Sequence, residues 1–133
     1  MAAVIVQNMS FKAGQTLTIT GVPNTDATNF AINIGHEQDI ALHLNPRFDA
    51  HGDQNTIVCN SYQGGCWCDE IRGGNFPFQP GQEFKMMITF NAEEFQVTLS
   101  DGSVINFPNR PRDTKYRHFK FEGDARINGI EIK

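Results

Sequence analysis

The sequence has no long apolar segment, no basic leader and no excess of positive charge. No window approaches the roughly 18 apolar residues that a membrane-spanning helix requires. The first residues, MAAVIVQN, lack both the basic n-region and the full apolar h-region of a signal peptide. The 11 Lys and Arg residues are outnumbered by 15 Asp and Glu residues, for a net charge of −4. Because nucleic acids and anionic membranes attract positive charge, neither is expected as the main partner. We therefore expect a soluble protein that is made in the cytosol and inserts into no membrane.

Cysteine is scarce, with Cys59, Cys66 and Cys68 as its only occurrences. An odd number of cysteines without a secretory signal favours free thiols. The Cys66-Trp67-Cys68 spacing also fits a metal site or a redox pair. Zinc needs four ligands, however, and only Cys59 and a few histidines could complete the set. Two cysteines flanking one strand residue also do not reach disulfide distance easily. Reduced thiols without a bound metal are the simpler expectation.

The sequence also lacks internal repeats, linkers and any sustained apolar stripe at helical spacing. It consists of short segments rich in β-branched and aromatic residues, separated by turn residues. At 133 residues it has the length of one domain, 1–133. We predict an all-β sandwich of two antiparallel sheets. A jelly roll is favoured, although the pattern does not separate it from an immunoglobulin-like sandwich. The predicted strands are 4–6, 15–21, 29–35, 40–48, 56–60, 83–90, 95–99, 104–107, 118–121 and 127–132.

The segment 42–48 carries a row of unusual polar side chains. In a strand, alternate residues share a face, so His43, Asn45 and Arg47 lie together. The residues that alternate with them face the core: Leu42, Leu44, Pro46 and Phe48. Pro46 has no N–H, so a local gap in the hydrogen-bond ladder is expected there. An ordinary solvated face would carry Lys, Glu, Thr and Ser. Three planar, multidentate groups in one row indicate ligand recognition instead. A buried polar network that braces the sheet fits this strand equally well.

Two further segments can extend this row. The strand ending at Asn60 brings that side chain to the row if it pairs with 42–48. After a Gly-Gly turn, Glu70 and Arg72 share one face. Trp67 has the opposite parity and needs a bulge, or a place at the start of the strand, to join them. The alternative for Trp67 is a core anchor, because tryptophan is usually largely buried.

The turn between the strand at 42–48 and the strand ending at Asn60 adds His51 and Asp53 near the row. Asp53 and Glu70 are natural partners for the two arginines, and such a lattice fixes donor directions. A sugar presents an apolar C–H face and a rim of hydroxyls. The tryptophan could cover about 60–80 Å² of that face, worth about 2 kcal/mol, and the polar row supplies donors and acceptors. Galactose has its axial 4-hydroxyl beside its apolar patch, so this arrangement can select it over glucose.

These residues resemble the signature of the galectins, the S-type β-galactoside-binding lectins. The family pattern is His-x-Asn-Pro-Arg, then a Val-x-Asn strand, then Trp-Gly-x-Glu-x-Arg. This sequence has HLNPRF at 43–48, IVCN at 57–60 and WCDEIR at 67–72. The resemblance covers essentially the whole chain and is closest to prototype single-domain vertebrate galectins. Further similar segments are 55–61, 76–81 and 107–110.

The resemblance implies a jelly-roll sandwich of the galectin and concanavalin type, with a sugar groove on one sheet. His43, Asn45 and Arg47 would bind the galactose 4-hydroxyl, and Asn60 with Glu70 would bind its 6-hydroxyl. The tryptophan would stack on the ring. A neutral imidazole can accept from a hydroxyl, whereas an imidazolium only donates. We therefore expect sugar binding to weaken between about pH 7.5 and about pH 5.

The resemblance also extends the site toward a second sugar. Arg47, Glu70 and Arg72 would reach it, while His51 and Asp53 would lie at the edge and brace the arginines. It further implies β-galactosides such as lactose and N-acetyllactosamine as ligands, no metal or cofactor, reduced cysteines, and export from the cytoplasm by a non-classical route.

Two departures from the family pattern are visible. Leu44 replaces a common phenylalanine and should be neutral, because it faces the core by parity. Cys68 replaces the usual glycine beside the tryptophan. It could tilt the indole, crowd the groove or make it sensitive to oxidation. A galectin-fold interaction module with weakened sugar binding therefore remains the alternative function.

A glycosidase is the other alternative, because sandwich folds host such enzymes. Glycosidases need two carboxyl groups about 5–10 Å apart, one of them an effective general acid. Here Glu70 is expected to be neutralised by Arg47 and Arg72. We therefore predict a binding protein and not an enzyme.

The chain ends carry β-branched apolar residues that would otherwise be exposed. Terminal strands lying side by side at a sheet edge invite a partner, and a two-fold contact there would continue the sheets between subunits. A homodimer would let a lectin with one site per subunit cross-link glycoconjugates. The alternative is that these residues close the monomer core. The predicted interface residues are Val4, Ile5, Val6, Ile127, Ile130 and Ile132.

Overall fold

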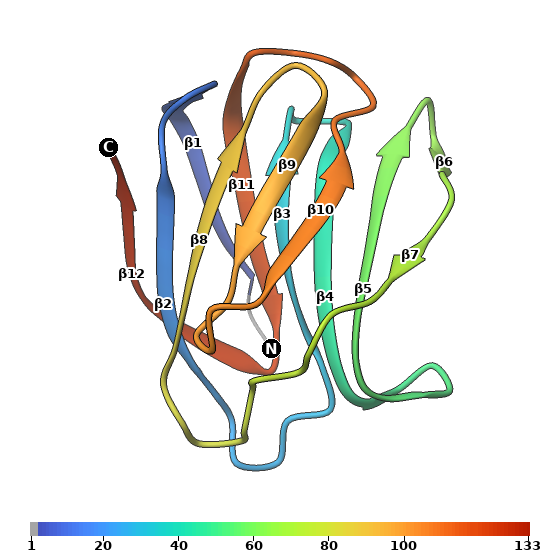
Figure 1. Ribbon diagram of the computed structural model, residues 1–133, viewed down its shortest axis with the longest axis vertical. Helices are drawn as coiled ribbons and strands as arrows, with labels where there is room; N and C mark the ends of the chain where they lie inside the picture. Colours follow the sequence, from blue (N-terminus) through green and yellow to red (C-terminus); the bar gives the residue numbers. More distant parts are fainter. Residues whose placement is uncertain (1–2) are drawn as a thin grey trace.

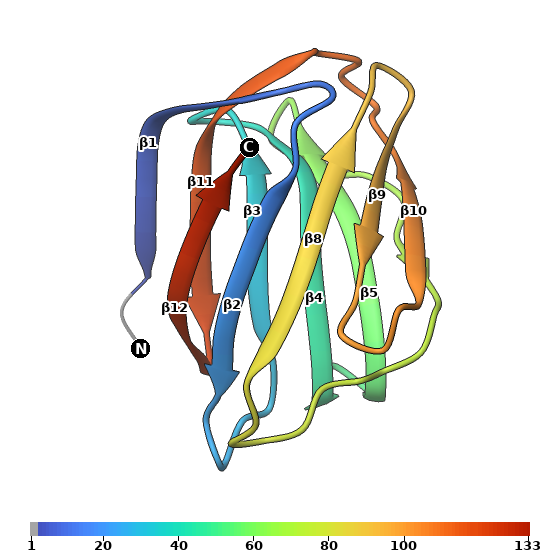
Figure 2. The ribbon, with the colours of Figure 1, turned by 60° about the vertical axis from the view of Figure 1, so that its left-hand side comes forward.

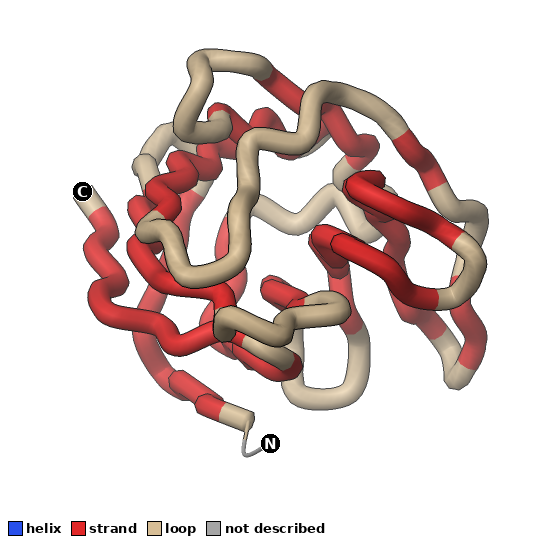
Figure 3. The backbone as a smooth tube through the Cα atoms, turned by 90° about the horizontal axis from the view of Figure 1, so that it is seen from below, coloured by secondary structure: helices blue, strands red, loops and turns tan. Residues whose placement is uncertain are grey.

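The computed structural model describes residues 3–133, so the first two residues of the expected domain lie outside the described part. These residues form strands and loops and no helix, arranged in two facing antiparallel sheets (Figures 1 and 3). None of them belongs to a helix long and apolar enough to span a bilayer. The strands are β1 (Val4–Lys12), β2 (Leu17–Pro23), β3 (Phe30–Gly35), β4 (Ile40–Ala50), β5 (Asp53–Gln63), β6 (Cys66–Trp67), β7 (Ile71–Arg72), β8 (Phe84–Phe90), β9 (Glu94–Thr98), β10 (Val104–Pro108), β11 (Lys115–Gly123) and β12 (Ala125–Ile132).

The larger sheet has the order β1-β11-β3-β4-β5-β6, with β7 also paired to β5, and the smaller sheet has the order β10-β9-β8-β2-β12. Figure 2 shows the smaller sheet in front of the larger one. The prediction of an all-β sandwich of two antiparallel sheets is confirmed. Each of the ten predicted strands corresponds to an observed one, while β6 and β7 are short additions in the segment 67–72 and just before it.

Alternation of apolar residues fills the space between the sheets. In β2, Leu17 and Ile19 are fully buried, and the threonines beside them are only partly so. Met86 and Ile88 of β8 are also fully buried. Burial of each such side chain contributes roughly 1.5–3 kcal/mol. The core is therefore continuous between the two sheets, and it holds the larger sheet as a rigid support for its outer face.

β3 is buried along its entire length, which is unusual for a strand of a two-layer sandwich. Phe30, Ile32 and Ile34 belong to the core. Ala31 and Asn33 point the other way by parity, yet they are only 6% and 4% exposed. Both residues line the groove described below, so the outer face is hollowed over β3.

β1 and β12 form the edges of the two sheets on the same side of the sandwich (Figure 2). Of the predicted interface residues, Val4 and Ile5 are 50% and 53% exposed. The other four pack against the core as partly buried side chains: Val6, Ile127, Ile130 and Ile132. These four thus take part in the monomer core, and only the first two present a bare apolar surface.

Candidate functional site

A groove of about 850 Å³ crosses the outer face of the larger sheet. Its lining comes from β3, β4, β5, β11 and the segment that carries β6 and β7. Seven of the nine predicted site residues line it, and the remaining two, Asp53 and Arg72, are held against that lining by ion pairs. The seven are His43, Asn45, Arg47, His51, Asn60, Trp67 and Glu70.

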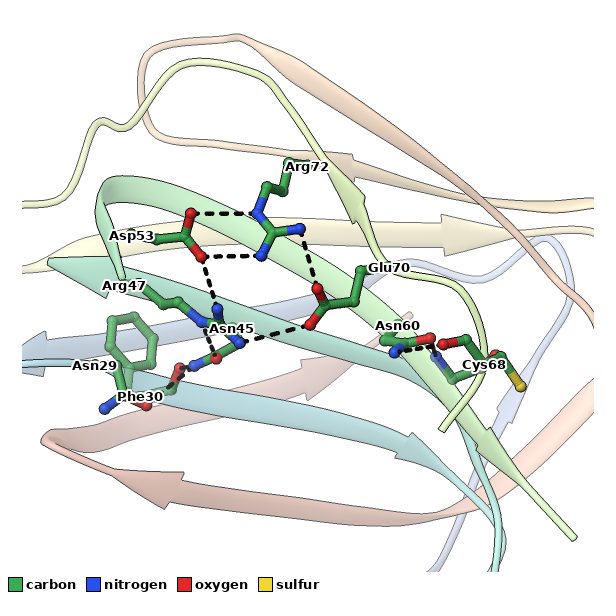
Figure 4. Close-up of polar contacts among 10 residues, drawn as sticks. Asn29, Phe30, Asn45, Arg47, Asp53, Asn60, Cys68, Glu70 and Arg72 are labelled. Carbon is green, nitrogen blue, oxygen red and sulfur yellow. Dashed lines mark hydrogen bonds and ion pairs between the residues drawn. The ribbon is translucent and has the colours of Figure 1, made fainter. Parts of the chain in front are cut away.

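The proline in the polar row explains how Asn45 is fixed. β3 pairs with β4 up to Ile32 opposite Leu44, and two residues further the same register would bring Phe30 opposite Pro46. Proline offers no N–H, so the ladder has the predicted gap there. Asn45 Nδ2 fills it by donating to the Phe30 carbonyl at 2.6 Å (Figure 4). The missing backbone donor is thus replaced by a side chain, which holds the buried Asn45 amide in one orientation.

Arg47 is only 8% exposed, so its charge must be compensated. Its Nε donates to Asn45 Oδ1 at 2.9 Å, and its Nη1 donates to Asp53 Oδ2 at 2.7 Å. Its Nη2 lies 3.8 Å from Glu70 Oε2. Among residues 3–133, no hydrogen bond takes the Nη2 protons, so they are available to a ligand oxygen.

Asp53 and Glu70 join both arginines into one closed lattice (Figure 4). Arg72 donates to both oxygens of Asp53, at 3.2 and 3.0 Å, and its Nη1 lies 3.0 Å from Glu70 Oε1. Hydrogen bonds from Arg72, and then from Arg47, hold the pKa of Asp53 below its ordinary value. Two cations and two carboxylates give a neutral cluster, as the sequence predicted.

His51 lies at the rim of the groove, in the turn between β4 and β5, with a positive φ of 52°. Within residues 3–133, no hydrogen bond connects it to Arg47 or Arg72. Asp53 therefore braces the arginines from this turn, whereas His51 lines the groove without a hydrogen bond to either arginine. Parity along the chain does not give the direction of a side chain in such a left-handed turn.

His43 stands beside the tryptophan, with ring centroids 4.8 Å apart. Its Nδ1 is 2.6 Å from Asn33 Oδ1. Burial lowers the pKa of His43 to about 4; the charge of Arg47 lowers it as well, whereas Glu122 and Glu70 oppose the shift. The ring is therefore neutral well below pH 6.5. This pKa places protonation of the ring below the pH range expected from the sequence, because periodicity does not show how deeply the ring is buried.

Trp67 is 52% exposed, so it is not a core anchor. Its ring lies 5.1 Å from that of Tyr62, which pairs with it across β5 and β6. β6 ends at Trp67 and β7 begins at Ile71, so the regular strand is interrupted over the three residues between them. This interruption resolves the parity conflict, because it brings the indole and Glu70 to the same groove. The ring offers a flat, accessible apolar surface.

Asn60 is secured by the segment that follows the tryptophan. Its Nδ2 donates to the Cys68 carbonyl at 3.1 Å (Figure 4). Its Oδ1 accepts from the Ser61 N–H at 2.7 Å. Cys68 lines the groove as a free thiol. Cys59, facing the core, is buried, and burial raises its pKa to about 12. Among residues 3–133, only the Cys68 carbonyl accepts from Asn60 Nδ2, so the second Nδ2 proton is available to a ligand.

Sequence reasoning missed Arg110. Its Nη1 donates to Ser61 Oγ at 2.8 Å and its Nη2 to the Asp69 carbonyl at 2.9 Å. It therefore ties the interrupted segment to β5. The only signal in the sequence was its place in the galectin-like segment 107–110.

The floor of the groove was also missed. Asn29 and Asn33 of the β3 region, and Lys120 and Glu122 of β11, contribute to the lining. Alternation along 29–35 puts both asparagines on one face. The strand predicted at 118–121, however, ended before Glu122, whereas β11 extends to Gly123.

Comparison with known proteins places this geometry in a family. Residues 2–132 match the family model for galactoside-binding lectins. The chain is 58% identical over 134 residues to the β-galactoside-binding lectin of Electrophorus electricus, a match that covers 100% of this chain and 99% of the relative.

Solved structures of galectins have the same fold as this chain. Galectin-1-L2 of Dario rerio has a TM-score of 0.96 at 66% identity, covering 98% of this chain and 99% of that one. Congerin II solved with lactose and MES has a TM-score of 0.95 at 38% identity, covering 99% and 100%. CG-16, a homodimeric agglutinin from chicken liver, has a TM-score of 0.93 at 35% identity, with the same coverage. The jelly-roll prediction is thereby confirmed, and the chain belongs to the galactoside-binding lectin family, the galectins.

Proposed function

We propose that this protein binds β-galactosides such as lactose and N-acetyllactosamine in the groove, without a metal or cofactor. The observation that carries the proposal is the neutral lattice of Arg47, Asp53, Glu70 and Arg72 beside the exposed indole of Trp67. Every polar group of that lattice is held in place before a ligand arrives, so binding costs little side-chain ordering. The relative from Electrophorus electricus carries the name β-galactoside-binding lectin, and congerin II was solved with lactose.

The groove matches the two chemical faces of galactose. The tryptophan provides a flat surface for the C–H patch, and the row of His43, Asn45 and Arg47 stands next to it for the axial 4-hydroxyl. Glucose has an equatorial hydroxyl there, which would leave buried polar groups without partners. Because the groove is open to solvent, we expect a dissociation constant on the order of 0.1–1 mM for lactose, about 4–6 kcal/mol.

The same lattice favours binding over hydrolysis. A general acid needs a raised pKa, yet Glu70 lies 3.0 Å from the Arg72 guanidinium and the pKa of Asp53 is lowered. Asp53 is thus held ionised by the arginines, and the Glu70 carboxylate is paired with the Arg72 guanidinium. A carboxylate in this state orients donors and does not protonate a leaving group.

We further propose that the protein cross-links glycoconjugates as a homodimer. The exposed Val4 and Ile5 lie on β1, an edge strand, with the edge strand β12 on the same side of the sandwich (Figure 2). Edge strands with apolar surface favour pairing with a second copy. CG-16 is a homodimeric agglutinin of the same fold. A dimer would raise avidity by roughly 10²–10⁴ without new sugar contacts.

Retention on lactose-agarose tests the proposal. We expect the folded protein to be retained and to elute with free lactose but not with sucrose, which contains no galactose. Passage of the folded protein through the column unretained would defeat the lectin assignment and favour the interaction module with weakened sugar binding. Lactose incubated with the protein for a day should remain intact.

A further inference from the structure

The groove floor beside His43 contains a chain of three polar side chains from three strands. Asn33 of β3 is only 4% exposed and lies between the other two. Its Nδ2 donates to Glu122 Oε2 of β11 at 2.9 Å and to the Lys120 carbonyl at 3.1 Å. Its Oδ1 is 2.6 Å from His43 Nδ1 on β4. The chain therefore runs from a carboxylate at the groove wall to the imidazole in the polar row.

The carboxylate end of this chain determines the orientation of the amide. Rotating the Asn33 amide by half a turn would direct its oxygen at two acceptors, the Glu122 carboxylate and the Lys120 carbonyl. Such an arrangement loses two hydrogen bonds and adds repulsion. The orientation with Oδ1 toward His43 is therefore strongly preferred.

That orientation in turn determines the tautomer of His43. An amide oxygen carries no proton, so the short contact requires the proton to be on Nδ1. Nε2 then carries a lone pair and can only accept. Of the amide oxygens in the polar row, Asn45 Oδ1 already accepts from Arg47, and Asn60 Oδ1 accepts from Ser61. His43 Nε2 has no such donor among the described residues and thus supplies a neutral acceptor for a sugar hydroxyl.

We propose that Glu122, acting through Asn33, is a positioning residue that sets the His43 tautomer and keeps its Nε2 an acceptor for the galactoside. The proposal rests on the proposed lectin function for the ligand, but the tautomer itself can be read in the sugar-free protein. The charged groups facing His43 come from each neighbouring element: Glu122 of β11, Arg47 of β4, and Glu70 between β6 and β7. Lys120 of β11 lines the same groove.

The test combines ¹⁵N NMR of the His43 ring with calorimetric lactose titrations from about pH 7.5 down to about pH 3.5. In the wild type, we expect an Nδ1–H tautomer. Glu122→Ala removes one of the two acceptors that orient Asn33, so the His43 spectrum should show mixed tautomers and the lactose Kd should rise about three- to tenfold. Glu122→Gln keeps an acceptor oxygen and should stay within about twofold of the wild type.

Asp113→Asn is the matched control. Asp113 Oδ2 lies 2.8 Å from His36 Nε2, so this carboxylate faces a histidine as well. Replacing it changes the net charge by the same amount as Glu122→Ala does. Neither Asp113 nor His36 lines the groove. Its lactose affinity and His43 spectrum should be unchanged. Because Glu122 favours the imidazolium, Glu122→Ala should also move the acid limb of lactose binding to lower pH, an effect that a merely structural role would not produce.

An Nε2–H tautomer in the sugar-free wild type would overturn the proposal. So would a Glu122→Ala variant with an unchanged His43 spectrum, whatever its lactose affinity, because the effect would then come from direct contact with the sugar. A changed tautomer with wild-type affinity would refute the link to binding. If the wild type bound no lactose, the lectin function would fail, while the sugar-free spectra would still decide the tautomer.

Discussion

Replacing Trp67 with alanine removes the apolar half of the proposed site while leaving the polar half in place. The indole is 52% exposed and contacts the rings of Tyr62 and His43 at the surface, outside the core cluster. Stacking on galactose covers about 60–80 Å² of apolar area, worth about 2 kcal/mol, which corresponds to roughly a 30-fold rise in Kd. A ligand with a dissociation constant on the order of 0.1–1 mM would then be hard to detect.

Calorimetry with lactose measures this change, and thermal unfolding provides the check on folding. Because the ring is outside the core, Trp67→Ala should unfold within a few degrees of the wild type. Val104→Ala removes a 42% exposed apolar side chain from the opposite sheet and should leave affinity unchanged. Trp67→Phe keeps a flat ring and should fall between the wild type and Trp67→Ala. A folded Trp67→Ala with normal lactose affinity would refute the stacking assignment.

Three further predictions follow from the charges and edges of the molecule. Because burial lowers the pKa of His43 to about 4 and only the neutral ring accepts, lactose affinity should be flat from about pH 7.5 to about pH 5 and fall toward pH 4; a midpoint near 6.5 would contradict this. Saturating EDTA should leave lactose affinity unchanged, since hydrogen bonds fill the site, and a loss of affinity would reveal a metal requirement. Light scattering at tens of micromolar should show a dimer, and Ile5→Asp should convert it to a folded, lactose-binding monomer. Val104→Asp, at a comparably exposed position away from β1 and β12, should stay dimeric. A monomeric wild type would end the interface proposal.

The polar row was predictable because it depends on a local rule. Alternation along 42–48 places His43, Asn45 and Arg47 on one face without knowledge of any other strand. Opposite charges close together in the sequence likewise made the arginine lattice predictable. The direction of the His51 side chain was not predictable in this way. The same local rule accounts for the core faces of β2 and β8.

The parts that were missed depend on register between distant strands. Asn33 meets Glu122 and Arg110 meets Ser61 only because particular residues of non-adjacent segments come into line, and a slip of one residue would reverse every face. Trp67 was ambiguous for a related reason, since the interruption after β6 breaks the alternation on which the prediction relied.

The terminal residues illustrate a third limit of local pattern. β-branched residues at both ends fit either a core edge or an interface, and sequence alone does not separate the two. The structure divides them: Val6 and Ile130 pack against the core, whereas Ile5 is exposed. An aspartate at Val6 or Ile130 would therefore disturb the monomer itself, which makes Ile5 the cleaner probe of association.

The central claim is that the groove reads the axial 4-hydroxyl of galactose, and calorimetric titration with lactose and cellobiose tests it most directly. The two disaccharides differ only in the configuration at C4 of the non-reducing ring. Lactose should bind with a dissociation constant on the order of 0.1–1 mM, and cellobiose should bind at least about tenfold more weakly, because its equatorial hydroxyl leaves the polar row unpaired. Equal affinities for both sugars, or no heat with lactose from the folded protein, would contradict the account.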